Sequence, residues 1–288
     1  RSCEEDCGDL HRRLSMIFCP AAISCIFSPK IDQDPLRTGS IGVGFTINRG
    51  VVAKPSSEIT FNGKKIDFPT VEFVLKENKM EGVELISDLP LGCGFGLSGA
   101  SALATAFLSE KPAVELYDLA HIAEVVNLTG LGTVATQVFS GLVIRKSASC
   151  PSRIVVERYA WNYELDFLSL GSISTREVLT TRKNISEIGM KWLKEFMKKV
   201  TLENLFRCSK AFAVETGLIE PVKDIIEAVE SSGGMASMAM LGKTVFAYNG
   251  FEALKEFGKP FKAKIECIGV RKVESFGNSV QNRRFEQC

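Results

Sequence analysis

The chain has 288 residues, of which 45% are hydrophobic and 24% are charged, and its formal net charge is +1. This length can bury a substantial core and allows one large or two moderate domains. No long run of lysine and arginine and no interleaved aromatic stripe is present, which argues against a nucleic-acid-binding surface. We therefore expect small-molecule partners and no nucleic acid.

The nine cysteines are scattered, odd in number and without a CxxC pair. Reduced thiols in a cytoplasmic protein are the simplest interpretation. The apolar run 16–27 follows Arg12 and Arg13 as in a secretory signal, but it contains Pro20 and lacks a small-residue cleavage pattern. We interpret this run as a buried first strand. No run reaches the ~18 to 20 apolar residues that a membrane-spanning helix needs, so we expect no membrane association.

The order of predicted elements indicates an α+β protein of two lobes. Residues 1–15 are polar and are interpreted as an N-terminal extension. Turn residues and apolar patterning predict strands over 22–27, 42–47, 51–54, 59–61, 71–75, 83–87, 141–145, 154–158, 165–170, 244–248 and 262–270. Helical spacing predicts helices over 97–108, 113–128, 185–199, 202–216, 221–230 and 251–256, with a glycine turn at 231–240. We place the lobes at 16–165 and 166–288.

The segment 90–108, PLGCGFGLSGASALATAFL, has three glycines at alternate positions directly before a predicted helix. Gly92, Gly94 and Gly96 let the backbone approach a ligand closely and adopt dihedrals that are closed to other residues. The free N–H groups and the positive end of the helix would face this loop, which favours a phosphate there. Ser98 and Ser101 add hydroxyls suited to a phosphate oxygen or to magnesium. The segment predicts nucleotide binding; the alternative is a tight strand-to-helix turn.

Two familiar phosphate-binding motifs do not fit this segment. A Walker loop requires GxxxxGK[ST], and no lysine follows these glycines. A dinucleotide-binding fold requires a βαβ unit, whereas the predicted elements after the loop are two helices in succession.

Three stretches resemble the motifs of the GHMP kinases, the small-molecule kinases named for galactokinase, homoserine kinase, mevalonate kinase and phosphomevalonate kinase. Residues 19–22 (CPAA) resemble the first motif, 90–101 the second and 233–237 (GGMAS) the third. Within the superfamily the likeness is closest to the archaeal pantoate kinases, through the stretches 34–44, 173–179 and 235–242.

The resemblance implies a two-lobed fold, with a β-rich N-terminal ATP-binding lobe and a ferredoxin-like C-terminal lobe. It implies ATP and Mg²⁺ as cofactors and a small hydroxy acid as the phosphoryl acceptor. Ser98 and Glu124 stand where the family places its magnesium ligands, although spacing alone would make Glu124 an ordinary solvated carboxylate. The residues expected to bind the nucleotide are Pro90, Gly92, Gly94, Gly96, Leu97, Ser98, Gly99, Ala100, Ser101, Gly233 and Gly234.

Two positions depart from the family pattern. Many members have an aspartate as general base where this chain has Thr133, and lysine or histidine where it has Ala22. General-base assistance is typically worth 10²–10⁴-fold, whereas phosphoryl transfer depends mainly on positioning and charge stabilisation. We therefore expect activity to survive these departures, with Thr133 beside the reacting hydroxyl.

An acidic substrate needs a cation, and Arg37 is the first candidate because a guanidinium binds carboxylate or phosphate with two parallel hydrogen bonds. Lys30 and Arg176 are the next candidates, and an ordinary surface charge is the alternative for each. Asp32 and Asp34 are further candidates, to replace the missing base.

The favoured function is phosphorylation of pantoate to 4-phosphopantoate, a step toward coenzyme A. One alternative is a mevalonate-pathway kinase that phosphorylates mevalonate 3-phosphate at its 5-hydroxyl. A second alternative is a nucleotide-binding protein without catalysis. A homodimer is the oligomeric state to be tested.

Overall fold

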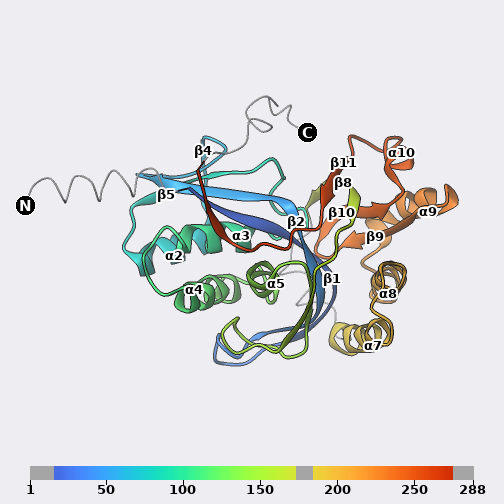
Figure 1. Cartoon of the computed structure of the whole chain (residues 1–288), viewed down its shortest axis with the longest axis horizontal. Helices are drawn as coiled ribbons and strands as arrows, with labels where there is room; N and C mark the ends of the chain where they lie inside the picture. Colours follow the sequence, from blue (N-terminus) through green and yellow to red (C-terminus); the bar gives the residue numbers. More distant parts are fainter. Residues whose placement is uncertain (1–15, 173–183, 275–288) are drawn as a thin grey trace, which may run out of the picture.

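The computed structural model describes residues 16–172 and 184–274. In this part of the chain two sheets lie side by side, each with helices packed on it (Figure 1). This arrangement confirms the predicted two-lobed α+β fold. No helix of the two described ranges is long and apolar enough to cross a membrane.

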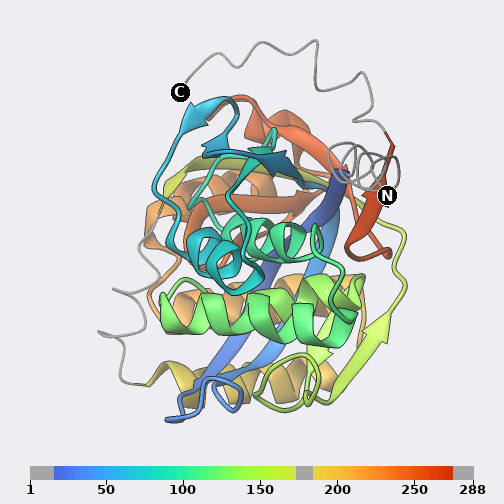
Figure 2. The same cartoon turned by 90° about the vertical axis from the view of Figure 1, so that its left-hand side faces the viewer.

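The strands of the first sheet come from residues 16–159, apart from one strand at 271–273. Its strands are β1 (Met16–Lys30), β2 (Gly39–Ser56), β3 (Ile59–Phe61), β4 (Lys64–Lys65), β5 (Gly82–Ile86), β6 (Leu142–Arg145), β7 (Val156–Tyr159) and β12 (Arg271–Val273). Their order is β12-β1-β2-β5-β3-β4, and β6 pairs with both β2 and β7. The helices on this sheet, which Figure 2 shows in front of it, are α2 (Pro69–Asn78), α3 (Leu97–Ala106), α4 (Ala113–Val126) and α5 (Thr133–Phe139).

The second sheet is formed by β8 (Glu164–Ser172), β9 (Met235–Ala239), β10 (Gly242–Tyr248) and β11 (Phe261–Lys264). All its pairs are antiparallel and the order is β11-β8-β10-β9, which is the order of a ferredoxin-like sheet. The boundary predicted at 165/166 falls just inside β8. The remaining helical elements are α7 (Ile185–Met197), α8 (Leu202–Glu215), the 3₁₀ turn η1 (Glu220–Val222), α9 (Lys223–Ser231) and α10 (Phe251–Leu254).

The two lobes share one apolar core. The ring of Phe27 on β1 contacts Phe212 on α8 edge-on, with ring centroids 5.4 Å apart. Phe45 on β2 contacts Phe246 on β10 in the same way, also at 5.4 Å. The long strands β1 and β2 thus bury side chains against both lobes, and the functional groups near them are held from two sides.

The stretch 71–75, predicted to be a strand, is part of helix α2, so that prediction is wrong. Pro69 occupies the first turn, where its missing N–H costs nothing, and the Glu72 carboxylate accepts a hydrogen bond from the Phe68 N–H. Val71, Val74 and Leu75 are buried at helical spacing, and this packing overrides their strand propensity.

Other segments also differ from prediction. Helix α5 is absent from the predicted elements, because its seven residues are too few to show a helical period. The predicted glycine turn at 231–240 is shorter, since β9 begins at Met235. The strand predicted over 262–270 ends at Lys264.

Candidate active site

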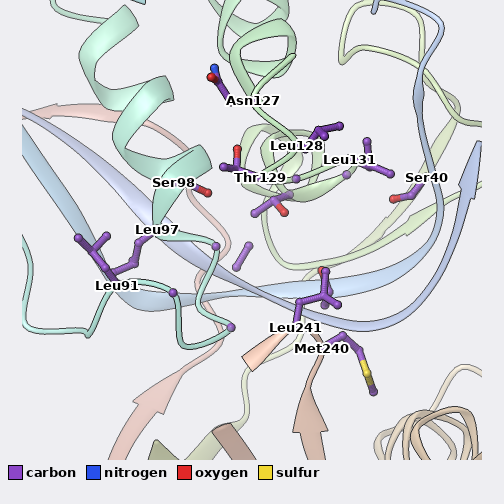
Figure 3. Close-up of a pocket in the computed structure, with 18 of the residues that line it drawn as sticks. Ser40, Leu91, Leu97, Ser98, Asn127, Leu128, Thr129, Leu131, Met240 and Leu241 are labelled. Carbon is purple, nitrogen blue, oxygen red and sulfur yellow. The ribbon is translucent and has the colours of Figure 1, made fainter. Parts of the chain in front are cut away.

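A cavity of about 520 Å³ lies between the helices of the first lobe and the strands β1 and β2 (Figure 3). The glycine loop and the first turn of α3 form one side, and residues 127–133 form another. Met240 and Leu241 enter from the second lobe, which makes the cavity a site shared by both lobes.

The glycine loop has the backbone conformation that its sequence predicts. Gly92, Gly94 and Gly96 have φ values of 75°, 94° and 62°, which favour glycine. Both lobes hold the loop: the Ala22 N–H donates to the Phe95 carbonyl at 2.9 Å, and the Thr244 hydroxyl donates to the Cys93 carbonyl at 2.6 Å.

The N-terminus of α3 is open toward this cavity. Gly96 is its N-cap, no side chain caps it, and no acidic residue lies in its first turn. Its N–H groups and positive dipole end therefore suit an anion. Leu97 and Ser98 line the cavity, whereas Gly99, Ala100 and Ser101 are buried behind them and Pro90 lies outside the lining. Of the residues expected to bind the nucleotide, five line the cavity: Gly92, Gly94, Gly96, Leu97 and Ser98.

Glu124, on α4, is buried directly beneath the cavity wall. One carboxylate oxygen, Oε1, accepts a hydrogen bond from the Thr129 hydroxyl at 2.7 Å, and the Ser98 hydroxyl lies near the carboxylate. The other oxygen, Oε2, is buried without a partner in the described part of the chain. Burial raises the pKa of Glu124 above its ordinary value, and the two hydroxyl groups offset part of that rise.

Ser98 and Glu124 together fit a magnesium ion. An unpartnered carboxylate oxygen beside a serine hydroxyl supplies the oxygen ligands that Mg²⁺ prefers, and this ion usually keeps several waters. Residues 16–172 and 184–274 contain no cluster of three or more His, Cys, Asp and Glu that would form an all-protein metal cage. Gly130 makes room for the free oxygen, because a side chain there would clash with Glu124 Oε2.

Thr133 and Ala22, the two departures from the family pattern, both lie next to Gly96. Thr133 is the first residue of α5 and lines the cavity together with Ala22. A side chain added at Gly96 would clash with the Thr133 methyl group. The position expected for the base therefore holds a threonine whose methyl group packs against the loop.

Arg145, on β6, is a fully buried cation that nothing in the sequence singles out. Its guanidinium donates to the Ser40 carbonyl at 3.1 Å and to the Thr136 hydroxyl at 2.6 Å, both neutral groups. No carboxylate of the described residues forms an ion pair with it. Burial lowers the pKa of Arg145 to about 10, so it stays charged at neutral pH. Ser40 lines the cavity, so this charge lies just behind the wall.

The other candidate cations lie elsewhere. Lys30, at the end of β1, and Arg37, in the loop between β1 and β2, are exposed and do not line the cavity. Arg176 lies outside the described residues. The carboxylates of Asp32 and Asp34 accept hydrogen bonds from backbone N–H groups of their own loop and so stabilise its conformation.

His121, one turn before Glu124, is buried, and its Nε2 lies 2.9 Å from the Thr38 carbonyl. Burial lowers the pKa of His121, which favours the neutral ring. This histidine therefore ties helix α4 to the end of the β1–β2 loop.

Gly233 and Gly234 form the turn between α9 and β9, and neither lines the cavity. The Gly234 N–H donates to the Val229 carbonyl at 3.0 Å, as in an ordinary helix-terminating turn. The opposite end of β9 approaches the glycine loop instead. Just after this end, Gly242 at the start of β10 is required, because a side chain there would clash with the Cys93 carbonyl.

A glycine loop opening a helix in a β-rich lobe, with a ferredoxin-like lobe closing the cavity, is the architecture of the GHMP kinases. A solved phosphotransferase related to the CoA biosynthesis pathway superposes with a TM-score of 0.80 at 26% identity, covering 91% of this chain and 99% of that one. A homoserine kinase from Cytophaga hutchinsonii, at 18% identity and a TM-score of 0.61, covers 90% of this chain and 97% of its own and shares the fold.

Relatives found by sequence similarity identify the family more narrowly than the shared fold does. The pantoate kinase of Methanocaldococcus jannaschii is 36% identical over 274 residues, covering 87% of this chain and 98% of the relative. That of Methanospirillum hungatei is 31% identical over 282 residues, covering 88% and 94%. No protein-family model matches the chain. The chain belongs to the pantoate kinase family, and it is a small-molecule kinase.

Proposed function

We propose that this protein transfers the γ-phosphoryl group of ATP to a hydroxyl of pantoate, giving 4-phosphopantoate. The observation that supports it most is the identity to pantoate kinases over nearly their whole length. The mevalonate compounds of the alternative hypothesis are named only for structural neighbours of much lower identity, which share the fold alone. The free thiols of the six described cysteines agree with the proposed cytoplasmic location.

On the donor side, the glycine loop and the α3 N-terminus would hold the phosphates of ATP. Ser98 and Glu124 would hold Mg²⁺, which neutralises charge on the transferring phosphoryl group when it is bound. The free Oε2 of Glu124 and the uncapped helix support this assignment.

On the acceptor side, we assign Arg145 as the source of positive potential for the pantoate carboxylate. A fully buried guanidinium with only neutral partners leaves charge uncompensated, and the cavity wall at Ser40 is where an anion would compensate it. Thr133 presents no carboxylate to take the hydroxyl proton. Catalysis therefore depends on positioning of the substrates and on stabilisation of charge in the transition state, as is usual for phosphoryl transfer.

Purified protein with ATP and Mg²⁺, assayed against pantoate, mevalonate and mevalonate 3-phosphate, tests the proposal. We expect turnover with pantoate and none with the mevalonate compounds. Inactivity on all three would contradict the proposal, and tight ATP binding without turnover would indicate a nucleotide-binding protein without catalysis.

Arg145→Met tests the acceptor assignment, with Arg37→Ala and Lys30→Ala as matched controls that also remove one positive charge. Removing one partner of a buried charged contact is expected to lower kcat/KM for pantoate by roughly 10²-fold, while the ATP affinity stays near wild type. Arg145→Lys keeps the charge and should recover part of the activity if the methionine variant folds poorly. If Arg37→Ala lowers kcat/KM for pantoate more than either Arg145 variant does, the cation that binds the carboxylate is Arg37 in the β1–β2 loop.

A further inference from the structure

Gln137 is a fully buried amide on α5 that the proposed function does not use. Its Nε2 donates a hydrogen bond to the Gly96 carbonyl at 2.9 Å. Its Oε1 is buried without a partner among the described residues. A buried amide whose oxygen has no hydrogen-bond partner lowers the stability of the fold, so its presence points to a role other than stability.

The bond from Gln137 reaches the loop at its last glycine. Gly96 is the N-cap of α3 in the left-handed region, and its carbonyl also accepts the Ala100 N–H at 3.1 Å, the first backbone hydrogen bond of the helix. An oxygen facing this carbonyl would be repelled, so only the amide nitrogen suits the position. The orientation of the Gly96 peptide fixes where the first N–H groups of α3 point.

The unpartnered oxygen lies beside the metal-binding carboxylate. A Cβ placed on Gly99 would be 3.0 Å from Gln137 Oε1 and 3.1 Å from Glu124 Oε2, so both free oxygens flank this glycine. A neutral amide is compatible with a nearby buried carboxylate, whereas a second carboxylate would be repelled by it.

We propose that Gln137 is a positioning residue for the phosphate-binding loop. It holds the Gly96 carbonyl so that the α3 N-terminus is directed into the cavity before nucleotide arrives. Because α5 begins at Thr133, the same side chain links the acceptor side of the cavity to the donor side. This inference rests on the proposed function in one respect, namely that the loop binds the phosphates of ATP.

The test uses Gln137→Met, which keeps the length of the side chain and removes the donor, and Gln137→Glu, which keeps its shape. Asn78→Leu is the matched control, because Asn78 is also a side-chain amide buried without a partner but lies at the end of α2 outside the cavity lining. We expect the Kd of Mg-ATP to rise about tenfold in Gln137→Met and further in Gln137→Glu. The KM for pantoate should stay within about twofold, and Asn78→Leu should bind ATP as wild type does.

Hydrogen exchange separates positioning from general destabilisation. In Gln137→Met we expect faster exchange of amides 96–101 relative to the middle of α4, and in Asn78→Leu no such difference. Unchanged ATP affinity and unchanged exchange in a folded Gln137→Met would overturn the inference. A wild-type protein that does not bind Mg-ATP would instead overturn the proposed function.

A measurement on the nucleotide-free wild type keeps the inference testable if both variants fail to fold. The Ala100 amide should exchange as slowly as those in the middle of α3, since its acceptor is held in place. Rapid exchange at Ala100 in the free protein would overturn the inference.

Discussion

Glu124 is the residue on which the metal assignment depends most, and its titration is testable without turnover. Its pKa in the folded protein is raised, chiefly by burial, from an ordinary value of 4.5. Between that value and the raised one, the folded state binds more protons than the unfolded state. The free energy of unfolding of the metal-free protein therefore falls as the pH rises through this window.

Glu124→Gln removes the titration and the buried charge. We expect the metal-free variant to be more stable than wild type at neutral pH by about 1–3 kcal/mol, and the difference to shrink toward pH 4. Mg²⁺ should raise the Tm of wild type and not of the variant, and turnover should fall by roughly 10²-fold or more. Equal Mg²⁺ stabilisation of both proteins, measured by thermal denaturation, would contradict the assignment of Glu124 as a ligand.

Site residues differ in how far the sequence alone identifies them. The alternate glycines 92, 94 and 96 are predictable because a local motif requires their backbone conformation, and their positive φ values confirm it. Arg145 is not predictable, since it ends an apolar strand segment and its burial results from contacts with Ser40 and Thr136. Gly233 and Gly234 are expected from the sequence to bind the nucleotide, but they do not line the cavity. A glycine pair indicates a turn, and it does not indicate which ligand or strand lies nearby.

At the scale of elements, the glycine loop and α3 act as one unit whose geometry depends on Gly96. Gly96→Ala would combine left-handed strain with a clash against the Thr133 methyl group. Gly63→Ala is the matched control: Gly63 has a φ of 75°, and a side chain there meets nothing within 4 Å. Strain alone should cost the control about 1–2 kcal/mol.

We expect Gly96→Ala to lose more stability than Gly63→Ala in denaturant titrations and, unlike it, to lose ATP affinity by at least about tenfold. The physical reason is that the backbone must rotate away from the conformation that opens the α3 N-terminus. If the two variants bind ATP equally well, the loop does not bind phosphate in this conformation.

Two helices, α2 and α5, are not predicted from the sequence. Segments 71–75 and 133–139 contain Val and Thr residues that favour strands, and each is helical because its buried face matches a helix of the surrounding core. Both helices border the cavity region, at Phe68 and at Thr133. The long helices α4, α7 and α8 were predicted to within a few residues, because their apolar spacing persists over several turns.

At the scale of the whole molecule, the lobes are joined by more than the chain connection. Arg49 on β2 forms an ion pair with Asp88 at 2.7 Å, while its guanidinium lies 4.3 Å from the ring centroid of Phe261 on β11. Phe95 of the glycine loop packs against Phe167 on β8, with centroids 6.3 Å apart. The glycine loop is therefore part of the packing between the lobes.

This shared packing leads us to expect a single cooperative unfolding transition. Phe246 is fully buried on β10 between Phe45 of the first lobe and Phe206 of the second, with centroids 5.4 Å and 5.1 Å away. Phe246→Ala should cost about 3–5 kcal/mol, because it leaves a cavity at this junction. If the lobes unfold together, hydrogen exchange of strands β5 and β8 should accelerate by the same factor, since both then exchange through global unfolding. Faster exchange confined to β8, or two separate calorimetric transitions, would show that the lobes unfold independently. In that case the contacts from Thr244 and Phe167 would be too weak to hold the glycine loop for ATP.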